Sequence, residues 1–182
     1  DLATAREETY TRPGALPTVR PASILTDLAR RDFTVNAMAL ALNGDRRGDL
    51  LDPHGGRADL QAGLVRVLHA GSFKDDPTRV LRAARYETRL GFRLEDQTAA
   101  WLQASLGYLE AVSGARVHHE LSRIFHEPDP ERALARLEEW GALAAVHTGL
   151  SFDASRAWAF PQVRRLASSA APAAYWPLLA WD

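Results

Sequence analysis

The first segment whose side chains could do chemistry is RRDFTVNA, residues 30–37. Asp32 and Asn36 are four positions apart, so on a helix they would share one face, with Arg31 beside them. A carboxylate and an amide can pair with the vicinal hydroxyls of a ribose, while a guanidinium forks onto phosphate oxygens. The segment therefore favours a site for a ribose and a phosphate. The alternative is a surface helix on which Asp32 pairs with an arginine one turn away.

The second segment is KDDPTRVLRAARY, residues 74–86. Asp76 followed by Pro77 predicts a helix start, because a capping carboxylate often precedes a proline at the first helical position. At about 100° per residue, one face of that helix carries several arginines, with few acidic residues near them in the sequence. The arginines are Arg79, Arg82, Arg85 and Arg89, and the nearby acidic residues are Asp75, Asp76 and Glu87. Such a stripe is best tolerated with an anion on it, which favours a triphosphate or an RNA backbone over a solvated helix face.

The start of the same helix has groups that could read a nucleobase. Asp75 and Asp76 supply hydrogen-bond acceptors next to the donor fork of Arg79. Such a set could pair with the edge of a base much as another base would. It would let a protein choose between cytosine and adenine without a nucleic-acid template.

The rest of the chain must position these segments, and we expect its fold class to be α+β. The expected secondary structure changes from mixed strands and helices to helices alone near residue 70. A short strand is expected within the first residues, followed by a loop at 12–17 that is rich in Pro and Gly. A helix is predicted from Ser23 through Leu40, and a strand at 64–68. After Asp75 the apolar periodicity predicts helices. Their expected ranges are 76–90, 95–107, 115–127, 129–140 and 154–170.

Composition narrows the class of protein. The 182 residues carry 22 Lys and Arg against 23 Asp and Glu, a formal net charge of −1, so any basic patch must be local. The absence of Cys excludes a disulfide scaffold and a thiolate zinc site. No stretch is long and apolar enough to span a bilayer, so we expect no membrane partner and a cytoplasmic location. Because the chain begins at Asp1 rather than Met, we expect it to be a fragment; the sequence does not indicate an oligomeric state.

Four segments resemble motifs of the class II tRNA nucleotidyltransferases, the CCA-adding enzymes, and of the bacterial poly(A) polymerases built on the same plan. RRDFTVNA is similar to their ribose-recognising motif, and DDPTRVLRAARY to their base-selecting Glu-Asp-x-x-Arg motif. DPHGG at 52–56, with Asp59 and Leu60, resembles the hinge between head and neck. GARVHHEL at 114–121 resembles the Arg-Ile-x-x-Glu-Leu stretch of the neck. The four motifs occur in the family's order.

The resemblance implies a division of the chain into three parts. Residues 1–70 would be the C-terminal part of an α/β nucleotidyltransferase head. Residues 71–145 would be a helical neck that selects the base and binds RNA, and residues 146–182 would begin a helical body.

The resemblance also implies which side chains meet the incoming nucleotide and which take part in catalysis. The nucleotide-binding residues would be Arg31, Asp32 and Asn36 for the ribose, Asp75, Asp76 and Arg79 for the base, and Arg82 and Arg85 for the triphosphate. Asp75 stands where the family has Glu. Asp1 would be the third catalytic carboxylate. The family's paired Asp-x-Asp, which holds two magnesium ions, does not occur in this sequence. Mg²⁺ would therefore be held mainly by residues outside it, with no metal site within it.

The function implied is template-independent transfer of CMP and/or AMP from CTP or ATP to the 3′ end of tRNA, either CCA addition or partial CC or A addition. Two alternatives stay open. One is a poly(A) polymerase that acts on other RNA 3′ ends, and the other is a non-catalytic regulator that binds nucleotide or RNA.

Overall fold

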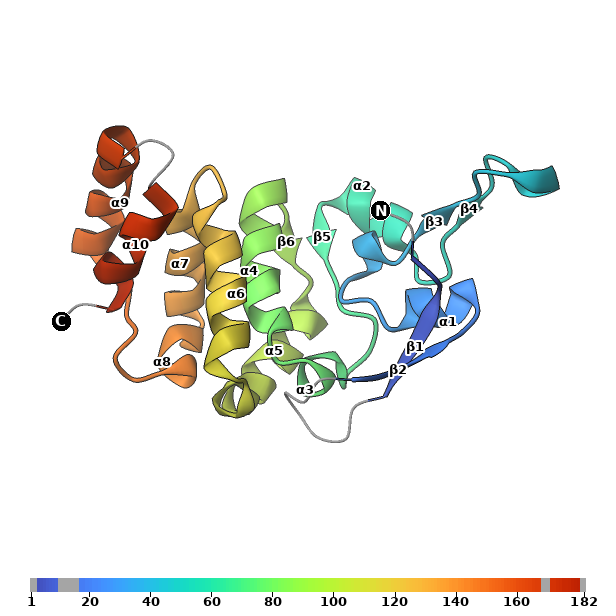
Figure 1. Cartoon of the computed structure of the whole chain (residues 1–182), viewed down its shortest axis with the longest axis horizontal. Helices are drawn as coiled ribbons and strands as arrows, with labels where there is room; N and C mark the ends of the chain where they lie inside the picture. Colours follow the sequence, from blue (N-terminus) through green and yellow to red (C-terminus); the bar gives the residue numbers. More distant parts are fainter. Residues whose placement is uncertain (1–2, 10–16, 168–170, 181–182) are drawn as a thin grey trace.

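The computed structural model describes residues 3–9, 17–167 and 171–180. Small sheets and short helices at one end of an elongated molecule give way to a row of helices at the other (Figure 1). The predicted α+β class is confirmed. The mixed part lies before α3 (Ser72–Asp75), and nearly all the elements after it are helical.

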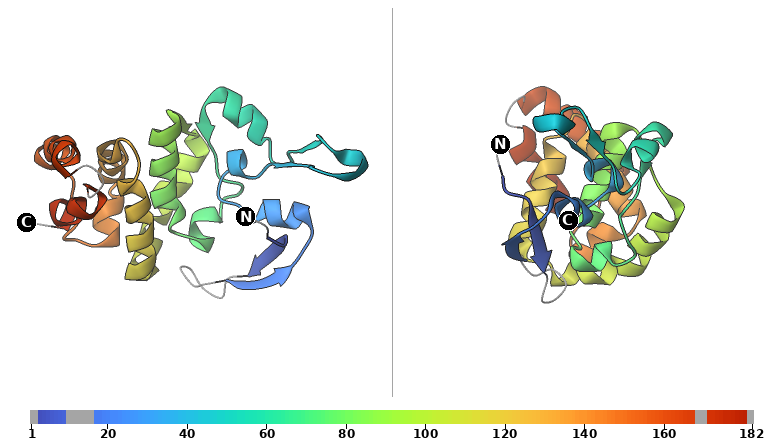
Figure 2. Two further views of the ribbon diagram at one scale, coloured as in Figure 1. Left: turned by 45° about the horizontal axis from the view of Figure 1, so that its top comes forward. Right: turned by 90° about the vertical axis from the view of Figure 1, so that its right-hand side faces the viewer.

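Two antiparallel hairpins and several short helical segments make up the first part of the chain. β1 (Arg6–Thr9) pairs with β2 (Thr18–Pro21), and β3 (Ala39–Leu40) pairs with β4 (Leu50–Leu51). The helical segments are α1 (Ile24–Ala29), η1 (Thr34–Asn36), η2 (Gly44–Arg46) and α2 (Gly56–Ala62). The β3–β4 hairpin projects away from the rest of the molecule (Figure 2).

The continuous helix expected over 23–40 is wrong, because α1 contains only six residues. After α1, Phe33 forms an antiparallel bridge with Val67, and the backbone N–H of Thr34 donates to the carbonyl of Arg66 at 2.9 Å. A helix would need these backbone groups for its own i to i−4 hydrogen bonds. The long-range bridge therefore replaces the helix at the segment that carries Asp32.

The second part of the chain is a row of helices. Their bounds are α4 (Arg79–Leu90), α5 (Asp96–Ser105), η3 (Leu106–Ala111), α6 (Gly114–Phe125), α7 (Pro130–Glu139), α8 (Ala142–Val146), α9 (Ala154–Ala167) and α10 (Ala171–Ala180). The predicted helices correspond to α4, α5, α6, α7 and α9. The strand expected at 64–68 is shorter, since β5 (Leu64–Val65) pairs in parallel with β6 (Arg93–Leu94).

The start of α4 differs from the prediction by a few residues. Thr78 is the N-cap and the helix begins at Arg79, so Pro77 precedes the helix. The Asp76 carboxylate still caps this turn, because its Oδ1 accepts hydrogen bonds from the backbone N–H of Thr78 at 3.1 Å and from its Oγ1 at 2.7 Å. A residue whose carboxylate caps a turn just before a helix can keep an extended backbone. The Asp-Pro pattern alone does not distinguish this arrangement from a cap directly at the helix start.

One hydrophobic core runs through both parts of the chain. It starts with Phe33 in the first part and continues to Leu179 in α10. Its largest buried side chains include Phe33, Phe73, Leu81, Leu102, Leu121, Ile124, Phe125, Leu134, Leu137, Phe160 and Tyr175. Because the core is continuous, the segment after α1 is held firmly against α4.

The turn that leads into α2 packs in close contact with η1. A Cβ added to Gly56 would lie 2.1 Å from the carbonyl oxygen of Thr34. Beneath it, the Asp59 carboxylate accepts a hydrogen bond from the Thr34 hydroxyl at 2.7 Å and from Nε of Arg66 at 3.0 Å. Arg66 also forms an ion pair with Glu95 at 3.2 Å, which links α2 to the start of α5.

We therefore predict that Gly56→Ala destabilises the fold, by about 1–3 kcal/mol, because the backbone of η1 must shift to admit one methyl group. Gly107→Ala is the matched control, since a Cβ there meets nothing within 4 Å. Urea unfolding of the two variants measures the difference. Equal urea midpoints for the two variants would show that the backbone of η1 can shift without loss of stability.

Candidate functional site

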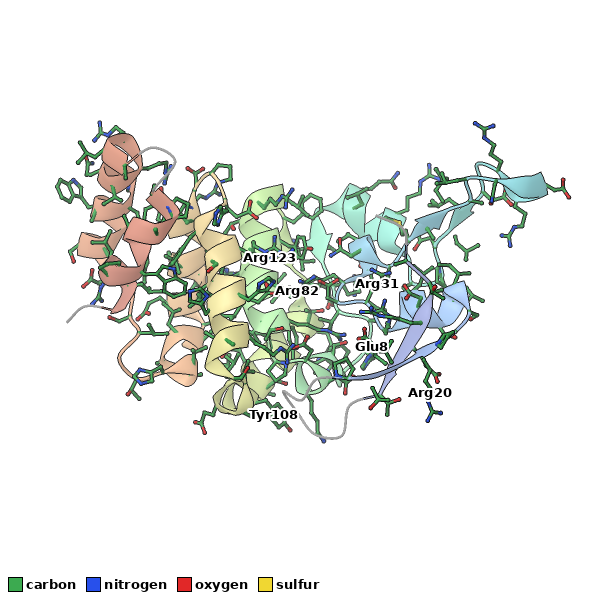
Figure 3. All side chains as sticks on the ribbon, in the orientation of Figure 1. Glu8, Arg20, Arg31, Arg82, Tyr108 and Arg123 are labelled. Atoms are coloured by element: carbon green, nitrogen blue, oxygen red, sulfur yellow. The ribbon has the colours of Figure 1, made fainter. Side chains whose placement is uncertain are left out.

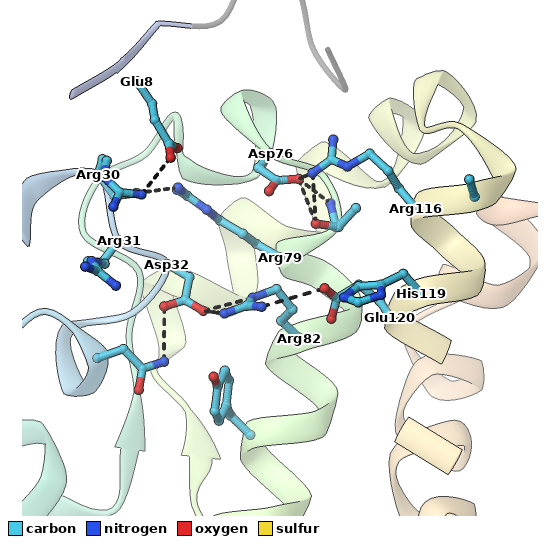
Figure 4. A pocket seen from close by; sticks show the side chains of 14 residues that line it. Glu8, Arg30, Arg31, Asp32, Asp76, Arg79, Arg82, Arg116, His119 and Glu120 are labelled. Carbon is cyan, nitrogen blue, oxygen red and sulfur yellow. Dashed lines mark hydrogen bonds and ion pairs between the residues drawn. The ribbon is translucent and has the colours of Figure 1, made fainter. Parts of the chain in front are cut away.

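A cavity of about 680 Å³ lies between the first part of the chain and helices α4 and α6 (Figure 4). Its walls contain Glu8, Arg30, Arg31, Asp32 and Asn36 from the first part, Asp76, Thr78, Arg79, Arg82 and Tyr86 from α4 and the turn before it, and Ala115, Arg116, His119 and Glu120 from α6. Glu8, Arg31 and Arg82 lie where these two parts meet (Figure 3). The size suits a small organic ligand, and the lining is mainly charged.

Asp32 accepts hydrogen bonds on both of its carboxylate oxygens. Its Oδ2 accepts hydrogen bonds from Nε of Arg82 at 2.9 Å and from Nη2 of the same guanidinium. Its Oδ1 accepts from Nδ2 of Asn36 at 3.1 Å and from the backbone N–H of Phe33 at 2.9 Å. Burial raises the pKa of Asp32, but the charge and hydrogen bonds of Arg82 outweigh burial and hold this pKa below its ordinary value. Asp32 is therefore an ionised hydrogen-bond acceptor at neutral pH.

The predicted pairing of Asp32 with Asn36 is present, although no helix produces it. The alternative of a surface helix with an arginine one turn away is wrong, because Asp32 is buried and its partner Arg82 is 50 residues further along the chain. Arg82 also lies 3.6 Å from Oε1 of Glu120. Burial lowers the pKa of Arg82, while Asp32 raises it, and the net pKa is above its ordinary value.

Asp76 and Arg79 also line the cavity, and the Arg79 guanidinium reaches across to Arg30 (Figure 4). Oδ1 of Asp76 accepts a hydrogen bond from Nη2 of Arg116 at 2.7 Å, besides those from Thr78. The Arg79 guanidinium donates to the carbonyls of Ser72 at 3.2 Å and Arg30 at 2.8 Å. Both side chains are thereby held in fixed orientations at the start of α4.

The arginines of α4 do not form one open stripe. Arg79 and Arg82 line the cavity, whereas Arg85 and Arg89 line a separate groove between α4 and α6. Their countercharges come from other elements: Asp32 and Glu120 for Arg82, and Glu127 for Arg85 and Arg89. Glu87, expected to offset them, instead forms an ion pair with Arg136 on α7 at 2.7 Å.

Most of the predicted nucleotide-binding residues meet in this cavity. The six that line it are Arg31, Asp32, Asn36, Asp76, Arg79 and Arg82. Asp75 lines a neighbouring hollow, where it lies 3.6 Å from Nε2 of His69, and Arg85 lines the groove. Asp1 lies outside the described residues.

The sequence reasoning missed several residues that line the cavity. Arg116, His119 and Glu120 have the i, i+3, i+4 spacing that places side chains on one face of a helix, so this signal was available in the predicted helix 115–127. Tyr86 also follows Arg79 and Arg82 at i+7 and i+4 on the predicted helix, whereas Glu8 has no such signal. Glu8 reaches the cavity through the packing of β1.

One carboxylate outside the cavity orients two arginines of its wall. Asp27 Oδ1 accepts hydrogen bonds from Nη2 of Arg30 at 2.6 Å and from the backbone N–H of Arg6 at 3.0 Å, and its Oδ2 accepts from Nε of Arg31 at 3.0 Å. Arg30 also donates to Glu8 at 2.7 Å. Burial raises the pKa of Asp27, but the hydrogen bonds from Arg30 and Arg31 outweigh burial and lower this pKa to about 2.

A part with small sheets and short helices packs against a row of helices with a charged cavity between them, an arrangement that fits the nucleotidyltransferase class. Family models agree with this class. Residues 1–66 match the Poly A polymerase head domain, and residues 91–152 match the probable RNA and SrmB-binding site of polymerase A. The chain belongs to the family of class II tRNA nucleotidyltransferases and bacterial poly(A) polymerases.

Individual relatives are similar over most of the chain. The A-adding tRNA nucleotidyltransferase of Halalkalibacterium halodurans is 46% identical over 164 residues, which are 86% of this chain and 38% of that protein. The CC-adding tRNA nucleotidyltransferase of the same organism is 45% identical over 108 residues, 59% of this chain and 28% of that protein. A solved CCA-adding enzyme, apo form II, superposes with a TM-score of 0.83 at 38% identity and covers 90% of this chain and 41% of its own. The chain thus spans less than two fifths of the length of these curated relatives.

Two further observations concern the described residues alone. They contain no group of three or more His, Cys, Asp or Glu side chains arranged to hold a metal ion. Within the same residues, none of the helices has the length and apolar character needed to cross a bilayer.

We predict that Asp27→Asn destabilises the fold by about 2 kcal/mol at pH 7, because two arginines and a backbone N–H lose an ionised partner. The pKa of Asp27 in the folded state lies below the value of 3.8 expected for the unfolded chain. The stabilisation is therefore present above about pH 4 and is lost as the pH falls towards 2. Urea unfolding at pH 7 and at pH 3 measures the gap between wild type and variant.

The matched control is Asp45→Asn at the exposed tip of the β3–β4 hairpin, which should change stability little at either pH. A gap between wild type and Asp27→Asn that stays constant from pH 7 to pH 3 would contradict the role given to Asp27.

Proposed function

We propose that this chain selects the incoming nucleotide during template-independent transfer of CMP and/or AMP from CTP or ATP to the 3′ end of tRNA. The observation that carries the proposal is the cavity in which the Asp32–Asn36–Arg82 cluster and the Asp76–Arg79–Arg116 cluster face the same space. The first three curated relatives are A-adding tRNA nucleotidyltransferases at 43–46% identity, and they support the tRNA substrate.

Solved structures with ligands support the same proposal. Complexes of a CCA-adding enzyme with CTP and with ATP are each 40% identical to this chain, with TM-scores of 0.72. The Thermotoga maritima CCA-adding enzyme complexed with tRNA is 40% identical, with a TM-score of 0.71. We infer that this cavity takes the same class of nucleotide.

The chemistry of the side chains suggests a division of roles. Ionised Asp32 and the Asn36 amide are proposed to bind the ribose hydroxyls, and Arg31 and Arg82 the charged phosphates. Asp76 would accept from the exocyclic amino group that cytosine and adenine share, and Arg79 would donate to the ring nitrogen or carbonyl beside it. Arg116 is proposed as a positioning residue, because it holds the Asp76 carboxylate in place.

We also propose the boundaries and surroundings implied by the resemblance. Residues 1–70 would belong to the head, 71–145 to the neck and 146–182 to the body. Transfer would require Mg²⁺, although the described residues do not form a site for it, so no step here depends on that ion. A cytoplasmic location is proposed because it would fit a role in tRNA maturation.

Because the chain spans only part of its relatives, the transfer reaction is tested on the full-length protein. It is incubated with Mg²⁺ and with tRNA that lacks its 3′-terminal nucleotides, each nucleotide is supplied separately, and the products are sequenced. We expect extension that stops after one to three nucleotides. A long A tail would instead identify a poly(A) polymerase. Absence of extension on both tRNA and an RNA primer would leave the non-catalytic regulator.

We predict that Asp76→Asn lowers transfer from both CTP and ATP by about tenfold or more, because it replaces an acceptor with an amide opposite the amino group that the two bases share. Asp75→Asn makes the same chemical change at the adjacent residue, which lines another hollow, and should leave both transfer rates nearly unchanged. Single-nucleotide transfer with each triphosphate gives the rates.

Arg79→Ala tests the same role from the donor side. Normal nucleotide choice in that variant would overturn base reading by Arg79. A thermal melt of each variant separates this result from loss of folding, since Arg79 also donates to two backbone carbonyls.

A further inference from the structure

Glu120 on α6 is a buried carboxylate in the wall of the cavity, and one of its oxygens is unused. Its side chain is only 9% exposed, and its Oε2 is buried with no hydrogen-bond partner among the described residues. Its Oε1 lies 3.6 Å from Nη1 of Arg82, which is too far for a hydrogen bond. A buried acceptor without a donor is costly, so Glu120 would gain from any donor that came within reach.

Asp32, on the opposite side of Arg82, has both of its oxygens in use (Figure 4). Oδ2 accepts two hydrogen bonds from Arg82, and Oδ1 accepts one from Asn36 and one from the backbone N–H of Phe33. A carboxylate has about four lone-pair sites, and these hydrogen bonds fill them. A ribose hydroxyl can therefore bind Asp32 only if one of these donors leaves.

Arg82 is the donor that can leave. The N–H of Phe33 belongs to backbone that is fixed by a bridge to another segment. Asn36 is itself proposed to bind the ribose, so it would stay. The Arg82 guanidinium lies at the end of a long side chain, and it is placed between Asp32 and Glu120 (Figure 4). A small movement away from one carboxylate would bring it within hydrogen-bond distance of the other.

The surroundings of Arg82 allow that movement. Its Cζ lies 5.7 Å from the centroid of the Tyr86 ring, and attraction to the face of a ring does not fix the direction of the N–H groups. A guanidinium also has more N–H donors than one carboxylate can take. On Glu120, Arg82 would satisfy the buried Oε2 and would still have donors for a phosphate oxygen.

We propose that Arg82 exchanges Asp32 for Glu120 when a nucleotide binds, which makes Glu120 a positioning residue for ribose recognition. We call this step the partner exchange. It rests on the proposed function, in which Asp32 binds the ribose hydroxyls. Without Glu120, a hydroxyl on Asp32 would leave the charge of Arg82 in the cavity wall without a carboxylate, which is costly. Ligands with ribose hydroxyls therefore depend on Glu120, whereas ligands without them do not.

The test compares nucleotides that differ only in their ribose hydroxyls. Kd values of CTP and of 2′,3′-dideoxy-CTP are measured with the full-length protein, without tRNA, and the same is done for ATP and its dideoxy analogue. The wild type should prefer the hydroxyl-bearing nucleotide by about tenfold or more. Glu120→Gln should weaken binding of CTP and ATP by about tenfold and leave the dideoxy analogues within about twofold.

Glu127→Gln is the matched control, because it makes the same chemical change in a carboxylate that pairs with an arginine of α4 outside the cavity. Glu127 lies 3.3 Å from Nη1 of Arg85, and its side chain is 13% exposed. This variant should keep the wild-type preference for ribose hydroxyls. Glu120→Asp retains a carboxylate, and its preference should lie between those of Glu120→Gln and the wild type. Thermal melts check the folding of each variant.

Three binding results would overturn the partner exchange. One is an unchanged preference for ribose hydroxyls in Glu120→Gln, and another is an equal loss for both kinds of nucleotide, which would make Glu120 merely structural. The third is a wild type without such a preference. The proposed function is judged separately, by transfer to tRNA. The binding results therefore support or overturn the exchange whether or not a nucleotide is transferred.

A crystal structure of the full-length wild type with CTP decides the matter if Glu120→Gln does not fold. We expect the Arg82 guanidinium within hydrogen-bond distance of Glu120, and ribose hydroxyls on Asp32. Two hydrogen bonds retained from Arg82 to Asp32 beside bound CTP would overturn the exchange. A CTP hydroxyl bound directly to Glu120 would do the same.

Discussion

The ion pair between Asp32 and Arg82 is the contact on which the candidate site depends. It joins a segment of the first part of the chain to the first turn of α4, and both partners are largely removed from water. A buried charge that loses its partner is strongly destabilising. This pair therefore fixes the position of the first part of the chain relative to α4. The same contact orients Asn36 and places Arg82 near Glu120. A ligand that binds Asp32 or Arg82 must compete with this pairing, so a ligand that carries both hydroxyl donors and phosphate acceptors has an advantage.

Helix α4 places two kinds of chemistry on one rigid element. Arg79 and Arg82 face the cavity, while Arg85 and Arg89 line the groove on the side of α6 and α7. The buried apolar residues of α4, such as Leu81 and Ala84, pack into the common core. Because a helix fixes the spacing of its side chains, the distance between the two sites is set by the helix and not by flexible loops.

Much of the polar structure consists of arginines paired with carboxylates from other elements. Arg136 on α7 is an example: hydrogen bonds from its guanidinium to Glu87 raise its pKa, and the Glu87 carboxylate also accepts a hydrogen bond from the backbone N–H of Leu94 at 2.9 Å. Such pairs connect neighbouring helices of the row, and buried charged groups require this kind of partner. The groove differs from this pattern, because Arg85 keeps a buried donor unused and two exposed arginines have no described carboxylate beside them.

The sequence by itself determined the fold class, the approximate positions of the helices after Asp75, and six of the residues that line the cavity. These features depend on local periodicity, on helix-start residues and on short motifs, all of which are read within a few neighbouring positions. The tertiary structure decided where the first helix ends, since the bridge from Phe33 to Val67 competes with it. It also decided which arginines share a site, because their countercharges lie 50 residues away for Arg82 and 42 for Arg85. Pairing at such separations depends on how the helices pack, which local sequence patterns do not encode.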